Sequence, residues 1–313
     1  MAEEPLAQSS SAARLDAEVR EYESGLAAFA AARPRLFGIA YRMLGSAAEA
    51  EDIVQDVWLR WQATDRNVVE NAPAFLATTT TRMCINFAQS AQSRRETYVG
   101  PWLPEPVDTS SDPALGAERG EALSLAILLL LEKLSPTERA AYILREAFDY
   151  SHREIANVLQ LEEEHSRQLV SRARKHVVDS RRTSATSEEH RRLLEAFINA
   201  AKNGDVAAME ALFAEDVVSY SDGGGVVRTA ARAPVSGRER VAKFFASFAW
   251  HFWTGITLSW VEINGQPAVL VSRDGIPGAL GTIDASAQGI DQIMWIMRPS
   301  KLGAISAREQ KSR

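Results

Sequence analysis

The sequence predicts a multidomain fold in which two all-α domains precede a C-terminal α+β domain. Three observations predict it. Capped helical patterns run from about Leu15 to Arg95, a second set of short capped helices runs from Leu134 to His176, and alternating strand-like runs begin only at Val217. A chain of 313 residues is long enough for two or three domains that each bury their own core.

Changes in composition along the chain predict the domain boundaries. A segment with four prolines and an acidic bias, Pro101 to Pro113, has too little apolar content to fold alone. The expected segments are a disordered N-terminus at 1–14, a first helical domain at 15–96, a Pro-rich linker at 97–117, a second helical domain at 118–180 and a C-terminal domain at 188–313.

The elements of the first helical domain are predicted from helix caps. The helix Arg33–Leu44 ends at Gly45, and a capping box that begins at Ser46 opens a helix through Trp61. A polar loop over 65–71 then precedes a long helix that ends in a basic pair. The aliphatic run that follows the linker is read as a buried helix leading into the second domain.

The second helical domain has the plan of a helix-turn-helix unit. Its first helix starts at the capping box Ser135-Pro136-Thr137-Glu138, with Arg139 expected on the polar face. A second capping box at Ser151 starts a short helix, and a tight turn at Gln160 leads into a third. The residues expected on the buried stripe of that third helix are Leu169, Val170 and Ala173.

The third helix of this domain is the second helix of the helix-turn-helix pair. The second helix of such a pair lies in the major groove, so we expect this helix to contact DNA. The alternative is that the charged residues of this helix only form a solvent-exposed face and contact no DNA. The residues assigned to base edges are Glu163, Glu164, His165, Ser166 and Gln168. Those assigned to phosphates are Arg167, Arg172, Arg174 and Lys175.

Composition limits the function classes. The net charge of −6 argues against a protein that coats nucleic acid indiscriminately, because such binding comes from neutralised phosphates. The basic charge is local: six Lys or Arg residues stand against the single acid Asp179 between Arg167 and Arg182. The single cysteine, Cys84, allows no intrachain disulfide and no thiolate metal site. With neither a signal peptide nor a long apolar run, we expect a cytoplasmic protein with no membrane contact, metal or cofactor.

The C-terminal domain is predicted to be α+β, with a curved, mostly antiparallel sheet wrapped around helices. Gly204 caps one helix and Asp205 starts the next, a helix runs from Arg238 to Phe252, and Asn264-Gly265 is a strong hairpin signal. The expected strands are Val217 to Tyr220, Val226 to Arg232, Thr257 to Ile263, Ala268 to Arg273, Leu280 to Ala285 and Ile290 to Met297.

The two helical blocks, with AYRMLGSAAEAEDIVQDVWLRW, AFLATTTTRMCINFAQSAQSRRE and the run from Leu134 to His176, resemble regions 2 and 4 of an extracytoplasmic-function sigma factor of bacterial RNA polymerase. The resemblance implies promoter-specific initiation, with core polymerase, through its clamp helices and flap, and promoter DNA as partners. The residues that it assigns to polymerase are Asp52, Gln55, Asp56 and Trp58. Those that it assigns to the −10 element are Asn67, Thr79, Arg82, Asn86, Arg94 and Arg95.

The third block resembles the SnoaL-like, cone-shaped domain of a subgroup of these factors, the SigJ type. The motif residues are Trp102, Leu103 and Pro104 in the linker; Asp222, Gly223, Gly224 and Gly225; and Pro299, Lys301 and Leu302. Val226 and Arg298 stand where the subgroup often has Lys and Asn. The resemblance implies a regulatory contact between this domain and the sigma domains, and the sequence indicates no anti-sigma factor.

Two other interpretations remain open. One is a helix-turn-helix regulator that recruits polymerase, although such a protein has no use for the first helical block. The other is acid/base catalysis in the C-terminal domain, but nothing pairs a histidine with an aspartate, so no catalytic residue is predicted. The residues considered for it are Asp222, His251, Asp274, Asp284 and Asp291, with Trp250, Trp253, Trp260 and Trp295 as pocket walls.

Overall fold

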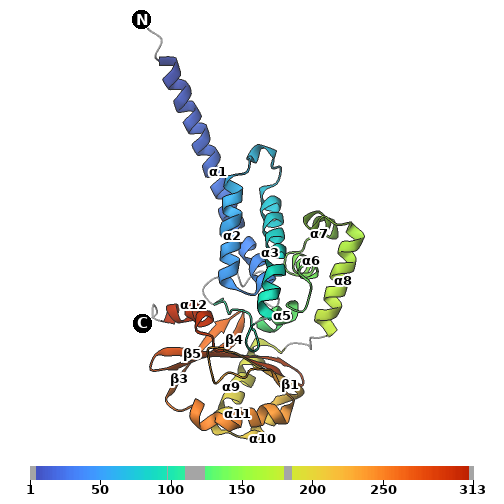
Figure 1. Ribbon diagram of the computed structural model, residues 1–313, viewed down its shortest axis with the longest axis vertical. Coiled ribbons are helices and arrows are strands. Elements are labelled where there is room, and N and C mark those ends of the chain that lie inside the picture. The colour runs from blue at the N-terminus through green and yellow to red at the C-terminus, as the bar shows by residue number, and fades with distance from the viewer. Residues whose placement is uncertain (1–4, 97, 110–123, 180–184, 310–313) are drawn as a thin grey trace.

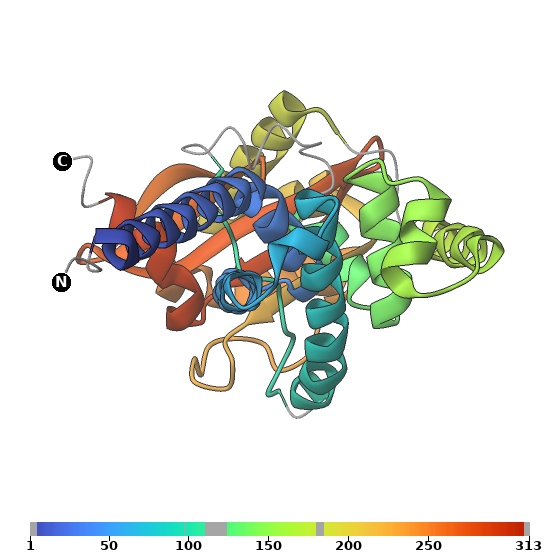
Figure 2. The same cartoon turned by 90° about the horizontal axis from the view of Figure 1, so that it is seen from above.

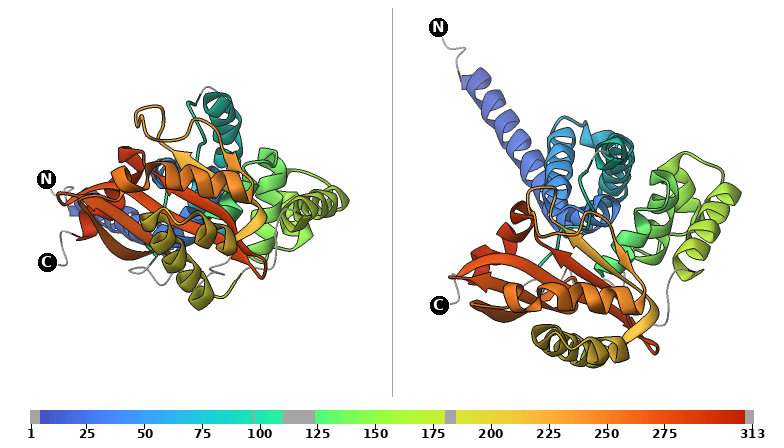
Figure 3. Two further views of the ribbon diagram at one scale, coloured as in Figure 1. Left: turned by 90° about the horizontal axis from the view of Figure 1, so that it is seen from below. Right: turned by 60° about the horizontal axis from the view of Figure 1, so that its bottom comes forward.

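The computed structural model describes residues 5–96, 98–109, 124–179 and 185–309 (Figure 1). Two helical domains lie on one face of a six-stranded C-terminal sheet, and further helices cover its other face (Figures 1 and 3). Among the helices that are described, none combines the length and the apolar composition needed to cross a membrane.

The first helical domain consists of α1 (Pro5–Leu44), α2 (Ala47–Gln62), the 3-10 turn η1 (Arg66–Val68) and α3 (Ala72–Glu96). The Ser46 hydroxyl caps α2 by accepting a hydrogen bond of 3.3 Å from the Glu49 backbone N–H. Because α1 begins at Pro5, most of the stretch that we expected to be disordered is helical. Its Ala, Leu, Gln and Arg residues favour that conformation.

The second helical domain consists of α5 (Leu125–Leu131), α6 (Pro136–Glu146), α7 (His152–Leu159) and α8 (Glu163–Asp179). Both predicted capping boxes are present, Ser135 with Glu138 and Ser151 with Glu154. Gln160 ends α7 in the left-handed conformation, with φ of 56°. The helix pair α7 and α8 therefore has the predicted helix-turn-helix arrangement, and α8 lies at one edge of the molecule (Figure 2).

The C-terminal domain contains four helices and six strands among its described residues. The helices are α9 (Ser187–Asn203), α10 (Val206–Leu212), α11 (Arg238–Phe252) and α12 (Pro299–Glu309). The strands are β1 (Phe213–Asp222), β2 (Val235–Ser236), β3 (Ile256–Ile263), β4 (Gln266–Arg273), β5 (Ile276–Ser286) and β6 (Gly289–Ile296).

The sheet has the order β2-β1-β6-β5-β4-β3, in which β1 and β6 are parallel and the other neighbours antiparallel. The predicted hairpin joins β3 to β4, with φ of 53° at Asn264 and 70° at Gly265. One predicted strand is wrong: Val226 to Arg232 forms turns, because the backbone N–H groups of Val226 and Val227 both bond to the Gly223 carbonyl.

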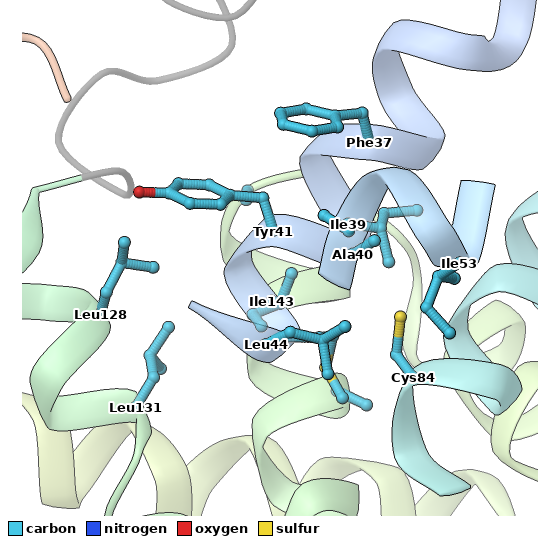
Figure 4. Packing of buried hydrophobic residues seen from close by; sticks show 14 of the residues in the cluster. Phe37, Ile39, Ala40, Tyr41, Leu44, Ile53, Cys84, Leu128, Leu131 and Ile143 are labelled. Atoms are coloured by element: carbon cyan, nitrogen blue, oxygen red, sulfur yellow. The ribbon is translucent and has the colours of Figure 1, made fainter. Parts of the chain in front are cut away.

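The described residues form two hydrophobic cores, and these do not follow the predicted domain boundaries. The first joins both helical domains to the outer face of the sheet, from Leu36 through Ile143 to Leu270. Figure 4 shows part of it, with Leu44 of α1 close to Ile143 of α6. The second core lies between α9, α10, α11 and the inner face of the sheet. The helical domains and the sheet therefore share a core, contrary to the expectation that each domain buries its own.

Candidate functional site

Helix α8, which we predicted to contact DNA, presents most of its predicted DNA-binding residues to solvent. Exposed positions are Glu164, His165, Arg167, Gln168, Arg172, Arg174 and Lys175, and Glu163 is half-buried. Four of these residues and Ser171, which the sequence analysis did not single out, line a shallow hollow. Ser166 does not fit its predicted base contact, because its side chain is fully buried and its Oγ lies 3.4 Å from His152 Nδ1.

The arginines of α8 are paired with acids in this arrangement. Arg167 contacts Glu163, Arg174 lies 2.6 Å from Glu146, and Arg172 lies 3.6 Å from Glu138. All three arginine side chains are more than half exposed, and exposed pairs of this kind contribute only ~0–1 kcal/mol. These guanidinium groups can therefore exchange their carboxylate partners for phosphates at little cost.

Arg82 of α3 reaches the helix-turn-helix domain. Its Nε donates to the Val158 carbonyl at 2.8 Å, and its Nη2 donates to the Asn157 carbonyl at 3.2 Å. These carbonyls lie in the last turn of α7, where cations are favoured. Arg82 is thus an interdomain contact in this conformation, rather than the free DNA-facing side chain that we expected.

The other residues assigned to the −10 element are placed differently. Asn67 and Asn86 are exposed, whereas the Thr79 hydroxyl donates to the Phe75 carbonyl at 2.8 Å. For Arg94 and Arg95 the side chains lie outside the described part of the structure. The structure therefore brings Asn67 and Asn86 to the surface without joining them to one site.

The predicted polymerase face lies on α2. Asp52, Gln55 and Asp56 are exposed, but Trp58 is half-buried and packs against the Phe29 ring at a centroid distance of 4.8 Å. Leu59, which the sequence analysis did not select, lies on the same face with an exposed fraction of 55%. Leu59 follows Gln55 by four residues and Asp56 by three, and residues at these spacings share a helix face. This spacing is the sequence signal that could have identified Leu59.

Arg139 corrects another sequence expectation. We expected it on a solvated face, but it is buried, and its Nη1 donates to the Met43 carbonyl at 2.6 Å and to Glu132 at 2.7 Å. Burial lowers the pKa of this guanidinium to about 10. A buried arginine therefore holds the end of α1 against the second helical domain.

The three sequence motifs of the linker and the C-terminal domain meet around Asp222, whose side chain is fully buried. Lys301 Nζ lies 2.7 Å from Asp222 Oδ2, and the Leu103 backbone N–H donates to the same oxygen at 3.0 Å. The Tyr98 hydroxyl donates to Asp222 Oδ1 at 2.6 Å. We call this group, comprising Tyr98, Trp102, Leu103, Asp222, Arg298 and Lys301, the clasp.

Lys301 is the cationic centre of the clasp. Its ammonium also donates to the Leu103 carbonyl and lies 4.6 Å from the centroid of the Trp102 ring. Burial lowers the pKa of Lys301, and the charge of Asp222 opposes that shift. Burial also raises the pKa of Tyr98 to about 12, as does its bond to Asp222, so this hydroxyl stays protonated and donates.

The glycines after Asp222 make room for the clasp. Gly224 has φ of 57°, and a Cβ there would lie 2.9 Å from Arg298 Cδ and 3.0 Å from the Tyr98 hydroxyl. At Gly225, φ is 74° and a Cβ would lie 2.9 Å from Val99 Cβ. Glycine is therefore required at these two positions for two reasons: the linker approaches closely, and the backbone is left-handed.

A second set of bonds holds the linker against α1 and the sheet. The Tyr41 hydroxyl donates to the Glu105 carbonyl at 2.6 Å and accepts from Asn264 Nδ2 at 2.8 Å. Asn264 Oδ1 accepts from the Val107 N–H at 3.0 Å, and Glu105 accepts from the Ala47 N–H at 2.9 Å. Residues 98–109 are thus fixed between the domains, which the Pro-rich composition did not predict.

The remaining motif residues, two prolines and one leucine, lie in the same region. Pro104 and Leu302 are buried, and Pro299 starts α12. Asp222 also fixes the end of β6, since its carbonyl accepts from the N–H groups of Met297 and Arg298 at 2.9 and 3.0 Å. The clasp therefore connects linker, β1, β6 and α12.

The residues considered for catalysis are scattered. A cavity of about 730 Å³ between α11 and the sheet is lined in part by His251 and Asp274, which are both exposed. Asp222, Asp284 and Asp291 do not line it. Of the tryptophans, Trp253 and Trp295 line the cavity, whereas Trp250 and Trp260 are exposed by 76% and 38%. Among the described residues no group of three or more His, Cys, Asp or Glu is placed to hold a metal.

Known families match each part of this geometry. The family described as Sigma-70 region 2 matches residues 28–94, Sigma-70 region 4 matches residues 124–177, and the SnoaL-like domain matches residues 194–276. The ECF RNA polymerase sigma factor SigJ of Mycobacterium tuberculosis is 34% identical over 288 residues, which cover 90% of this chain and 88% of that protein.

One further relative and one solved structure indicate the same family. A protein described as probable ECF RNA polymerase sigma factor SigI, also of M. tuberculosis, is 30% identical over 90% of this chain and 96% of its own length. The crystal structure of the M. tuberculosis extracytoplasmic function sigma factor SigJ superimposes with a TM-score of 0.72 and 30% identity, covering 89% of this chain and 98% of that one.

The matches also decide between the two transcriptional interpretations. A regulator that only recruits polymerase is wrong for this chain, because a sigma region 2 domain occupies the first helical block. Regions 2 and 4 together direct promoter-specific initiation of transcription. The chain belongs to the extracytoplasmic-function sigma factors of bacterial RNA polymerase.

Proposed function

We propose that the C-terminal domain regulates this sigma factor by holding it in a closed arrangement through the clasp. Arg82 carries the proposal, because a side chain expected at the −10 element is bonded to α7. Regions 2 and 4 contact DNA at two separate elements, so promoter binding requires Arg82 to leave Val158 and Asn157. The clasp opposes that separation by fixing the linker that joins the two regions.

We assign DNA and polymerase contacts to the surfaces described above. Arg167, Arg172, Arg174 and Lys175 bind phosphates near the −35 element, and Gln168 and His165 contact bases. Asp52, Gln55, Asp56 and Leu59 form the surface that docks on the polymerase clamp helices. Asn67 and Asn86 serve the −10 element together with Arg82 after opening.

The proposal also states how the C-terminal domain acts and whether a separate anti-sigma factor is needed. The C-terminal domain acts through intramolecular contact and not through catalysis, since its shielded aspartate, Asp222, is neutralised by Lys301. The fused domain takes over the part that a separate inhibitor plays elsewhere, so no anti-sigma factor is proposed. Because it binds RNA polymerase, we expect this protein in the cytoplasm.

The test is run-off transcription with sigma-free core polymerase at matched protein concentration. A variant with both Lys301→Ala and Asp222→Asn removes the ion pair of the clasp without leaving a buried unpaired charge, and it is expected to raise promoter output. Lys243→Ala is the matched control, since Lys243 is an exposed lysine of α11 that pairs with its helical neighbour Glu239. Equal output from the wild-type protein and both variants would contradict regulation through the clasp.

A further inference from the structure

Glu164 is an acidic residue in the middle of a surface that we assign to DNA. It is the second residue of α8, and side chains in the first turn of such a helix reach base edges in helix-turn-helix complexes. It is exposed, and it lines the shallow hollow of α8 together with Arg167, Gln168, Ser171 and Arg172. A carboxylate at this place repels phosphates, so the proposed phosphate contacts do not account for it.

The geometry of α8 turns Glu164 away from the domain. The buried stripe of this helix consists of Ser166, Leu169, Val170 and Ala173. Gln168 and Ser171 follow Glu164 by four and seven residues, so these three side chains share the helix face opposite the buried stripe. That face is the one that α8 presents outward at the edge of the molecule (Figure 2).

The two acids in the first turn of α8 differ in their partners. Glu163 contacts Arg167, which lies one turn further along the helix. Glu164 forms no ion pair or hydrogen bond within the described part of the chain. An acid in the first turn also interacts favourably with the helix dipole, but Glu163 already provides that interaction. Both carboxylate oxygens of Glu164 are therefore available to a partner outside the protein.

A carboxylate only accepts hydrogen bonds, which limits the bases that Glu164 can contact. In the major groove cytosine presents the donor of its N4 amino group, whereas guanine and thymine present acceptors. Adenine presents its N6 donor beside the N7 acceptor, and N7 repels a carboxylate oxygen. Cytosine is therefore the base that fits Glu164.

We propose that Glu164 is a specificity-determining residue for the −35 element, where its carboxylate accepts a hydrogen bond from the N4 amino group of a cytosine. The inference rests on the proposed placement of α8 in the major groove. Repulsion between this carboxylate and the phosphates weakens binding to every sequence, and the cytosine contact offsets that loss only at the matching site. Glu164 thus increases the difference in affinity between promoter and non-specific DNA.

The experiment is selection of duplexes from a randomised library by the holoenzyme, which is core polymerase with the full chain, followed by sequencing of the bound DNA. The wild-type holoenzyme is expected to prefer cytosine over adenine at one position of the −35 element by at least about fivefold. Glu164→Gln is expected to shift that position to adenine, because an amide donates to N7 and accepts from N6.

Glu163→Gln is the matched control, because it changes the neighbouring acid that contacts Arg167, and it is expected to keep the cytosine. An unchanged preference for cytosine in Glu164→Gln, or the same loss of it in both variants, overturns the proposal. Gln168→Ala separates this failure from failure of the proposed function. If only Gln168→Ala changes the selected sequence, α8 contacts bases and the role of Glu164 is wrong. If none of the three variants changes it, the placement of α8 in the major groove is wrong as well.

Discussion

Lys301 and Asp222 form a buried ion pair, and the two charges depend on one another. Lys301→Met leaves the Asp222 carboxylate buried without its cation, so the free energy of unfolding is expected to fall by about 3–5 kcal/mol. Asp222→Asn combined with Lys301→Met removes both charges and is expected to lose less than the sum of the single variants. Urea denaturation of all four proteins measures the coupling, and strictly additive losses would contradict the pair.

His190 is buried in α9, and burial lowers its pKa from 6.5 to about 4. Between these values the unfolded chain binds a proton that the folded chain does not. The stability that neutral His190 provides is therefore complete above pH 6.5 and is lost as pH falls toward 4, by up to about 1.4 kcal/mol per pH unit. Thermal unfolding of wild-type protein and His190→Leu over this range checks it: the variant must show the shallower pH dependence.

The arginines on α8 are expected to act through phosphate charge. Arg172→Ala or Arg174→Ala lowers affinity for promoter DNA at all sequences alike and reduces the salt slope of binding by about one unit per lost contact. Gln168→Ala, on the same exposed face, changes base preference and keeps the slope. Fluorescence anisotropy titrations at several salt concentrations distinguish the two, and a shifted preference in the arginine variants would show that the helix faces are misassigned.

At the scale of elements, the turn after β1 depends on Gly224. Gly224→Ala forces a Cβ into left-handed backbone and against Arg298 and Tyr98, which is expected to cost ~1–2 kcal/mol from the backbone alone. Gly278→Ala is the control, because that glycine has no positive φ and a Cβ there would meet nothing closer than the Val271 carbonyl oxygen at 3.9 Å. Equal melting temperatures for the two variants would mean that the turn does not require glycine.

Local sequence patterns predicted most helices and strands, but they did not predict the contacts between these elements. The boxes at Ser135 and Ser151 and the hairpin at Asn264-Gly265 involve residues within a few positions, so the sequence specifies them. Val226 to Arg232 has the alternation of a strand but turns instead, because the preceding glycines pack against the linker.

The same limit applies to the candidate sites. Ser166 and Arg139 carry polar side chains on helices, and only tertiary packing decides that they are buried. The three clasp motifs were identified in the sequence, but their convergence on Asp222 joins residues 79 to 124 positions apart, which no local pattern encodes.

At the scale of the whole molecule, one core and the clasp hold regions 2 and 4 and the C-terminal sheet together. Leu270 and Leu280 of the sheet belong to the same core as Leu36 of α1 and Ile143 of α6. Opening this arrangement exposes apolar surface, so it requires compensation by polymerase and DNA. Deleting the C-terminal domain exposes the same apolar surface permanently and so changes more than the clasp. Point variants of the clasp leave this core in place and therefore test the proposal more directly.

The most direct test of the closed arrangement is a distance between regions 2 and 4. Spin labels at Gln89→Cys in α3 and Arg153→Cys in α7 occupy exposed sites, while Cys84 is fully buried and burial raises its thiol pKa, so it stays unlabelled. Pulsed electron resonance is expected to give one narrow distance in the free protein and a longer one in the complex with core polymerase and promoter DNA. The same distance distribution in both states would contradict the claim that the factor opens to bind its promoter.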